Sequence, residues 1–246
     1  MIFVTGDCHM EYQKFNMANF PEQKNLTRED YMIICGDFGL WDDSKEQRYW
    51  LDWLSNKSFT LLFVDGNHEN FHLLNSYEIT KWHGGKIHRI RENLIHLMRG
   101  QVYEIEQKKI FTFGGAQSHD VSGGILDPLD SDFKTKKRWL NKENLPYRVK
   151  GLSWWEEEMP SKEEYEEGFR NLSINKWKVD YIITHCCSSN IQATFGHGLY
   201  EKNELTNYLE EVLKNLTFKK HYFGHYHDDR AIGEKYRMMF NDIKMI

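Results

Sequence analysis

Short apolar runs, each followed by polar residues, recur along the chain and indicate its architecture. The runs that show this pattern cover residues 2–5, 31–35, 59–64, 179–184 and 221–223. They are rich in β-branched and aromatic side chains and too short for stable helices, which favours buried strands. The sequence therefore places polar side chains where predicted strands end.

Helical patterns separate several of these strands. Ser44 suits the N-cap of a helix over residues 44–56, in which apolar side chains recur at helical spacing. Ser161 has a glutamate at capping-box distance and predicts a helix over 161–172, and regularly spaced leucines predict another over 201–216. Alternating strands and helices favour parallel βαβ units, whose loops gather at the carboxyl ends of the strands.

From residue 82 the pattern changes to short alternating runs, which predict an antiparallel portion. The runs cover residues 86–90, 94–98, 101–105 and 109–113, with a tight hairpin link at 106–108 and a final strand or hairpin within 230–241. Residues from about 116 to 160 are irregular and too few for a core of their own. We interpret them as an insert or cap on a single domain spanning 1–246, and their basic run 134–138 as a solvated loop rather than a polyanion site.

Composition limits the functional classes. The chain has 246 residues, is 40% hydrophobic and carries a net charge of −5, so it can bury a large core but offers no broad basic field. We predict no specific nucleic-acid partner. No apolar run approaches the roughly 18 residues that cross a bilayer, and the first residues are typical of a strand rather than a secretion signal. Four cysteines without CxxC spacing suit reduced thiols, so we expect a cytoplasmic protein without a membrane partner.

Five polar segments carry the candidate chemistry. They are Asp7-x-His9, Gly36-Asp37, Gly66-Asn67-His68-Glu69, His185 and Gly224-His225-x-His227. Imidazole, carboxylate and amide oxygen together suit manganese, iron or zinc better than calcium or magnesium. In extended backbone, residues i and i+2 face the same side, so each pair in the first and last segments can share one target. The other histidines are interpreted as structural or surface residues, with His197 as the first exception to consider.

The five polar segments, in this order, resemble the calcineurin-like metallophosphoesterase family. The resemblance extends over nearly the whole chain, and it implies an α/β fold in which two packed mixed β-sheets are flanked by helices in a four-layer αββα sandwich. It also implies two divalent metal ions, manganese first and iron or zinc as alternatives, that share Asp37. One ion would be held by Asp7, His9, Asp37 and His227, and the other by Asp37, Asn67, His185 and His225.

The implied activity is that of a phosphoric ester hydrolase. Two ions can clamp a phosphoryl group and lower the pKa of a shared water, so that a bridging hydroxide attacks phosphorus. The leaving oxygen then needs a proton, and His68 is the catalytic candidate for general acid by resemblance and by chemical type. The substrate would be a phosphomonoester or a phosphodiester on a small molecule, nucleotide or protein.

The sequence departs from some members of the family. Protein serine/threonine phosphatases carry an Asp and an Arg three and four residues past the second metal carboxylate, where this chain has Leu40 and Trp41. The carboxylate partner of His68 is then unidentified, although Asp42 and Asp43 directly follow these two positions in sequence. Many members carry Gly where Met10 stands, which implies a differently shaped pocket mouth.

Two alternatives remain beside the phosphoesterase hypothesis. One is a nucleotide pyrophosphatase or nuclease-type diesterase, and the other is a non-catalytic metal-binding scaffold of the same fold. A scaffold is expected to lose metal ligands or the acid, whereas here every ligand position and His68 are filled. The sequence therefore favours an enzyme, with its oligomeric state undetermined.

The role of His68 leads to a first prediction. Because His68 is assigned to proton donation rather than to a metal, His68→Ala should impair turnover far more than metal content. Steady-state kinetics and metal analysis of the same preparation test this, and an equal loss of both would remove the assignment.

Overall fold

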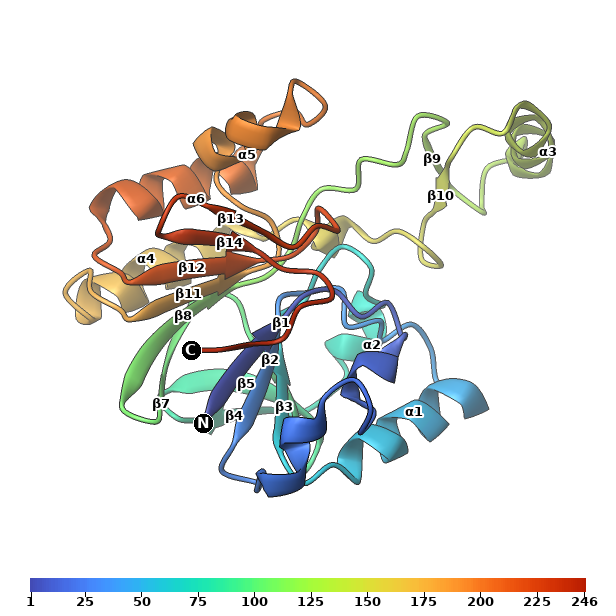
Figure 1. Cartoon of the computed structure of the whole chain (residues 1–246). Coiled ribbons are helices and arrows are strands. Elements are labelled where there is room, and N and C mark those ends of the chain that lie inside the picture. Colours follow the sequence, from blue (N-terminus) through green and yellow to red (C-terminus); the bar gives the residue numbers. More distant parts are fainter.

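Two mixed β-sheets pack face to face in the structure, a computed structural model that describes residues 1–246 (Figure 1). The first sheet has parallel β1, β2, β3 and β6 at its centre and antiparallel strands at both edges. In spatial order its strands are β15 (Lys244–Met245), β1 (Ile2–Thr5), β2 (Tyr31–Ile34), β3 (Thr60–Phe63), β6 (Leu94–Leu97), β5 (Gly85–Arg91) and β4 (Ile79–Trp82).

The second sheet has the same mixed character. Its parallel strands β8, β11, β12 and β14 are bordered by antiparallel β7 and β13. In spatial order its strands are β13 (Arg230–Ile232), β14 (Tyr236–Met238), β12 (Lys220–Phe223), β11 (Tyr181–Thr184), β8 (Lys108–Phe113) and β7 (Gln101–Ile105). The predicted antiparallel portion is thus divided between the two sheets.

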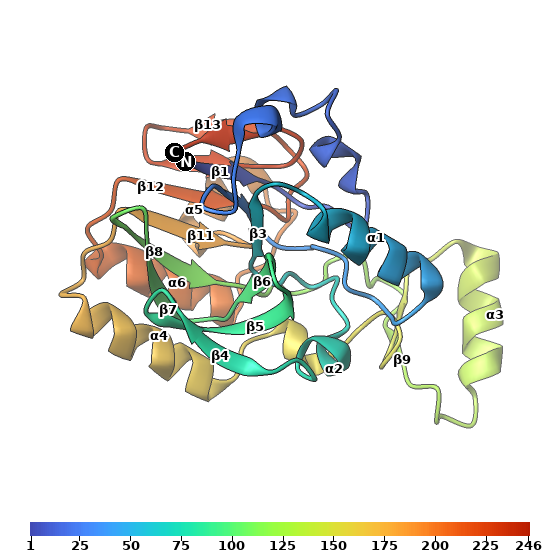
Figure 2. The same cartoon turned by 90° about the horizontal axis from the view of Figure 1, so that it is seen from below.

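Three layers of apolar side chains hold the sheets and helices together. Between the sheets, Ile33 and Leu62 belong to the same buried cluster as Ile110 and Ile183 of the second sheet. The outer face of the first sheet packs on α1 (Lys45–Ser55) and α2 (Phe71–Leu74), and that of the second packs on α4 (Lys162–Ile174) and α6 (Glu204–Asn215). The predicted four-layer αββα arrangement is confirmed, and Figures 1 and 2 show helices on both outer faces.

Local sequence signals account for several element ends. Ser44 caps α1 by accepting a hydrogen bond from the Gln47 backbone N–H at 3.1 Å, and Ser161 forms the predicted capping box of α4. Glu106 and Gln107 have φ angles of 51° and 59°, the left-handed pair that a two-residue hairpin needs between β7 and β8. The structure also has α5 (Ser189–Gly196) and 3₁₀ turns at Tyr12–Phe15, Pro21–Asn25 and Glu156–Glu158.

The insert at 116–160 contains more regular structure than its sequence predicts. It forms β9 (Ile125–Leu126), α3 (Phe133–Glu143) and β10 (Arg148–Val149), and Figure 1 shows these elements extending from the layered body. The interpretation of 134–138 as a loop is wrong, because this run lies in α3. Lys and Arg are good helix formers. Because Leu140 is the one buried residue of α3, the sequence of this helix has no apolar periodicity that would predict it.

None of the helices combines the length and apolar character needed to cross a bilayer. The assignment of residues 1–246 to a single domain stays a prediction.

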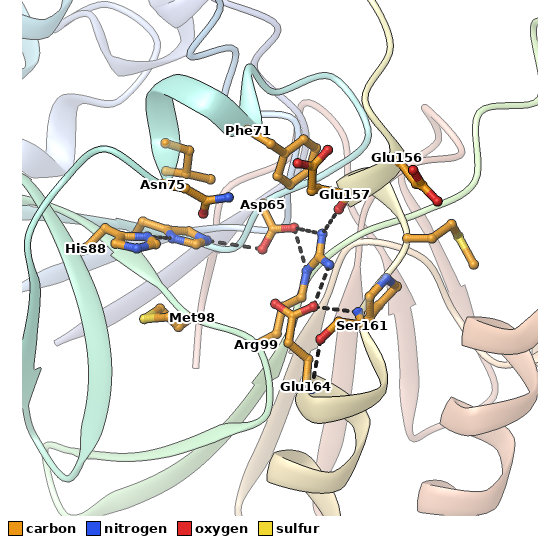
Figure 3. A pocket seen from close by; sticks show the side chains of 14 residues that line it. Asp65, Phe71, Asn75, His88, Met98, Arg99, Glu156, Glu157, Ser161 and Glu164 are labelled. Carbon is orange, nitrogen blue, oxygen red and sulfur yellow. Dashed lines mark hydrogen bonds and ion pairs between the residues drawn. The ribbon is translucent and has the colours of Figure 1, made fainter. Parts of the chain in front are cut away.

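A buried ion pair fixes the chain where β3 ends. Arg99 donates to Asp65 at 2.6 and 2.9 Å, and His96 Nε2 lies 3.1 Å from the other oxygen of the same carboxylate (Figure 3). Burial opposes ionisation of Asp65, but the Arg99 guanidinium holds its pKa well below its usual range. The network borders a cavity of about 610 Å³ that none of the predicted metal ligands lines. Asp65 thus anchors the strand end that carries Asn67.

Loss of Arg99 should destabilise the fold strongly. Arg99→Met leaves the buried Asp65 charge without its cationic partner, which costs roughly 3–5 kcal/mol, and adding Asp65→Asn should recover part of the loss. Urea unfolding measures both variants, with exposed Arg89→Met as control. Because the pKa of Asp65 is lowered, the ionised pair contributes stability above about pH 4 that is lost as the pH falls. An Arg99→Met protein as stable as the control would contradict this account.

Candidate metal centre

The carboxyl ends of strands from both sheets meet at one place, and the five polar segments lie there. Asp7 follows β1, Asp37 follows β2 and Asn67 follows β3 in the first sheet. His185 follows β11 and His225 follows β12 in the second. The segments from the two sheets are in direct contact, since the His225 backbone N–H donates to both oxygens of Asp7 at 3.1 Å.

Four side chains form a first group that could hold a metal ion. One ligand atom from each of Asp7, His9, Asp37 and His227 lies within 4.8 Å of all the others. His227 Nε2 lies 3.1 Å from Asp7 Oδ2, and His9 Nε2 lies 3.0 Å from His227 Nε2. Burial lowers the pKa of His9, which favours the neutral imidazole that binds metals. The donor atoms and their spacing therefore fit a divalent ion.

A second group lies on the other side of Asp37. His185 Nε2 is 3.2 Å from Asn67 Oδ1 and 3.3 Å from Asp37 Oδ1, and the ring centroids of His185 and His225 are 5.0 Å apart. Although burial disfavours the charged imidazole, the carboxylates of Asp37 and Asp7 raise the pKa of His185 to about 10. These carboxylates thus create a demand for positive charge that a divalent ion also satisfies.

The backbone around these groups is not extended. His9, Asp37, His225 and His227 have φ angles of 48°, 45°, 70° and 50°, in the left-handed region that non-glycine residues rarely adopt. The i, i+2 argument for Asp7 with His9 and for the last pair is therefore wrong, even though the side chains converge. Turns aim them inward, and such strain is characteristic of functional sites.

Two glycines allow the backbone to approach the carboxylates. A Cβ on Gly66 would lie 1.9 Å from Asp37 Oδ1, and a Cβ on Gly224 would lie 2.0 Å from Asp7 Oδ1. Any larger residue at either position would displace a carboxylate of the centre, so these positions require glycine.

Glu69, which had no predicted role, holds the loop that follows Asp37. Its buried carboxylate accepts hydrogen bonds from the backbone N–H groups of Phe38 at 2.7 Å, Leu40 at 2.8 Å and Gly39 at 3.3 Å. Burial, with the nearby Asp37 charge, raises the pKa of Glu69 to about 8, while these N–H groups act in the opposite direction. In the sequence, the only indication that Glu69 supports the centre was its position two residues after Asn67.

The insert orients Asn67. The Asn67 amide nitrogen donates to Ser118 Oγ at 3.1 Å, and Ser118 Oγ donates to Glu158 at 2.7 Å. Because its nitrogen faces Ser118, Asn67 turns its oxygen toward His185. Ser118 and Glu158 are both buried, and neither belongs to a polar segment, so sequence reasoning missed them.

His68 lies beside the first group. Its ring centroid is 5.0 Å from that of His9, and its backbone N–H donates to Asp37 Oδ1 at 2.8 Å. Burial lowers the pKa of His68 to about 4, and the charge of Arg148 acts in the same direction. Trp41 Nε1 donates to the His68 carbonyl at 2.9 Å, so Trp41 also positions this residue.

Neither of the two acidic candidates that follow Trp41 in sequence pairs with His68. Asp42 accepts from the Ser44 backbone N–H at 2.9 Å, and Asp43 pairs with Arg48 at 2.8 Å. Instead, Arg148 of the insert lies against His68, with Nη2 at 3.1 Å from Nε2.

A pocket of about 300 Å³ adjoins the centre at His225, between the insert and the segment after α5. His119 lines it, and the ring centroids of His119 and His225 are 5.1 Å apart. His197, the exception considered from sequence, is exposed at the C-terminal end of α5.

A protein-family model matches most of the chain. The family model described as "Calcineurin-like phosphoesterase" matches residues 1–229. No curated protein matches the chain. The matched residues include all five polar segments and the insert.

The contacts of Glu69 predict its effect on metal affinity. Glu69→Ala releases the three backbone N–H groups that hold the loop after Asp37, and loss of such a supporting contact typically weakens metal binding about 10- to 100-fold. Calorimetric titration of chelator-treated protein with Mn²⁺ measures the change. Glu46→Ala, on the exposed face of α1, is the matched control. Equal affinities of the two variants would show that Glu69 does not support the centre.

Proposed function

Since the chain belongs to the calcineurin-like phosphoesterase family, we propose that it hydrolyses a phosphomonoester or phosphodiester with two divalent metal ions. The observation that carries the proposal is the convergence of carboxylates, imidazoles and an amide oxygen from both sheets on the two sides of Asp37. Manganese is our first candidate, with iron or zinc as alternatives, because this mixture of nitrogen and oxygen donors suits borderline metals.

The residues divide into two ligand sets that share Asp37. The first set would be Asp7, His9, Asp37 and His227, and the second would be Asp37, Asn67, His185 and His225. The short distances within each group support this division. When bound, two such ions lower the pKa of water and neutralise charge on a phosphoryl group.

We assign His68 as the proton donor to the leaving oxygen. It contacts Asp37 through its backbone, its ring lies beside His9, and neither ligand set needs its side chain. Burial lowers the pKa of His68 to about 4, so it needs a nearby anion to be protonated at neutral pH. A bound phosphate group supplies that anion and raises the pKa of the ring, which couples protonation to substrate binding.

The substrate would be a phosphorylated small molecule, a nucleotide or a phosphoprotein. A nucleotide pyrophosphatase or nuclease-type diesterase is the alternative within the same chemistry, and a non-catalytic metal-binding scaffold is the alternative outside it. We also propose a cytoplasmic location, in keeping with four free, buried cysteines.

A substrate panel tests the proposed function. Chelator-treated protein receives Mn²⁺ and is assayed with para-nitrophenyl phosphate, its bis-ester, cyclic nucleotides, dinucleoside polyphosphates and phosphopeptides. We expect metal-dependent hydrolysis of at least one of them, abolished again by chelator. No hydrolysis of any substrate, together with no bound metal, would contradict the proposal.

A further inference from the structure

Arg148 is a positively charged residue that contacts His68 and belongs to neither proposed set of metal ligands. It lies in β10 of the insert, and its side chain is 17% exposed. Its Nη2 is 3.1 Å from His68 Nε2, so the guanidinium reaches the ring that we assign as proton donor. The insert thereby places a permanent positive charge next to His68.

A carboxylate of the same insert orients this guanidinium. Arg148 Nε donates to Asp120 Oδ1 at 3.1 Å, and Nη2 donates to Asp120 Oδ2. Asp120 is 46% exposed, whereas Arg148 is largely covered, so the pair presents the arginine inward and the carboxylate outward. Arg148 Nη1 makes no hydrogen bond in the structure and keeps its donors for another group.

A phosphoryl group suits those donors. A guanidinium forms strong charge-assisted hydrogen bonds to phosphate oxygens, and Nη1 is free to form one because Nε and Nη2 already contact Asp120. Near neutral pH a phosphomonoester carries a charge of roughly −1.5 to −2 and about three non-bridging acceptor oxygens. A phosphodiester has about one negative charge fewer and about one non-bridging oxygen fewer than the monoester. An arginine beside His68 therefore adds most to the binding of the monoester.

We propose that Arg148 binds a non-bridging oxygen of the substrate phosphoryl group and makes the centre selective for phosphomonoester dianions over diesters. This inference rests on the proposed phosphoesterase function and gives the insert a role in substrate choice. Arg148 and Asp120 both lie outside the five polar segments, so this selectivity is separate from metal binding. Asp120 acts as a positioning residue that holds the guanidinium toward His68.

The competing explanation is structural. The pair formed by Arg148 and Asp120 could simply fasten the insert to the body, since β10 pairs with β9 within the insert itself. In that case, removing Arg148 would affect all substrates equally. The two explanations thus differ in the ratio of monoester to diester turnover and in the affinity for free phosphate.

The test compares Arg148→Met and Arg148→Lys with the wild-type protein and with Arg138→Met. Arg138 is an exposed arginine on α3 of the same insert and makes no contact with the centre, so it is the matched control. Manganese-loaded proteins are assayed with para-nitrophenyl phosphate and its bis-ester, and inorganic phosphate binding is measured by calorimetry. Thermal melting checks that each variant is folded.

We expect Arg148→Met to lower the ratio of monoester to diester kcat/KM about 10- to 100-fold, and to weaken phosphate binding by a similar factor, as for loss of a charge-assisted hydrogen bond. Arg148→Lys should lie between this variant and the wild type, because lysine keeps the positive charge but cannot contact Asp120 and the phosphoryl group with separate guanidinium nitrogens. Arg138→Met should match the wild type in both measurements.

Three results would overturn the inference. They are an equal loss of both activities, unchanged phosphate affinity in Arg148→Met, and a wild-type enzyme that cleaves only the diester. A wild-type protein that hydrolyses neither ester would instead count against the proposed function. Phosphate calorimetry would still decide the role of Arg148 in that case, so the two failures are distinguishable.

Discussion

Burial of two carboxylates at the junction of the sheets is the constraint on which the rest of the structure depends. Asp7 and Asp37 are 2% and 1% exposed, and a buried carboxylate is costly unless hydrogen bonds and positive charge compensate it. The backbone N–H groups of His225 and His68 donate to them, and imidazoles from both sheets surround them. A site that concentrates negative charge in this way is suited to divalent cations.

Much of the fold could be predicted from sequence because its signals are local. Apolar runs located the strands, Ser44 and Ser161 marked helix starts, and the polar residues after the strands indicated one shared edge. Non-local contacts were hidden. Ser118 contacts Asn67 across 51 residues and Arg148 contacts His68 across 80 residues, and no periodicity or spacing reports such pairs.

Local backbone geometry at the centre was harder to predict from sequence than the chemistry of its residues. Extended backbone was expected to bring Asp7 and His9 to one side, yet left-handed turns do so at His9 and again at His225 and His227. Tertiary contacts hold these turns, since the backbone N–H of His9 donates to the Asp37 carbonyl and that of His225 donates to the Asp7 carboxylate. Residue chemistry thus identified the candidate centre, while the long-range contacts that shape it became visible only in the fold.

The central claim is that two metal ions share Asp37 at the junction of the sheets. Anomalous X-ray scattering from crystals of manganese-loaded protein tests it most directly. The account predicts two peaks about 3.5–4 Å apart, one on each side of the Asp37 carboxylate. A single peak among Asp7, His9, Asp37 and His227, with none beside Asn67 and His185, would contradict it.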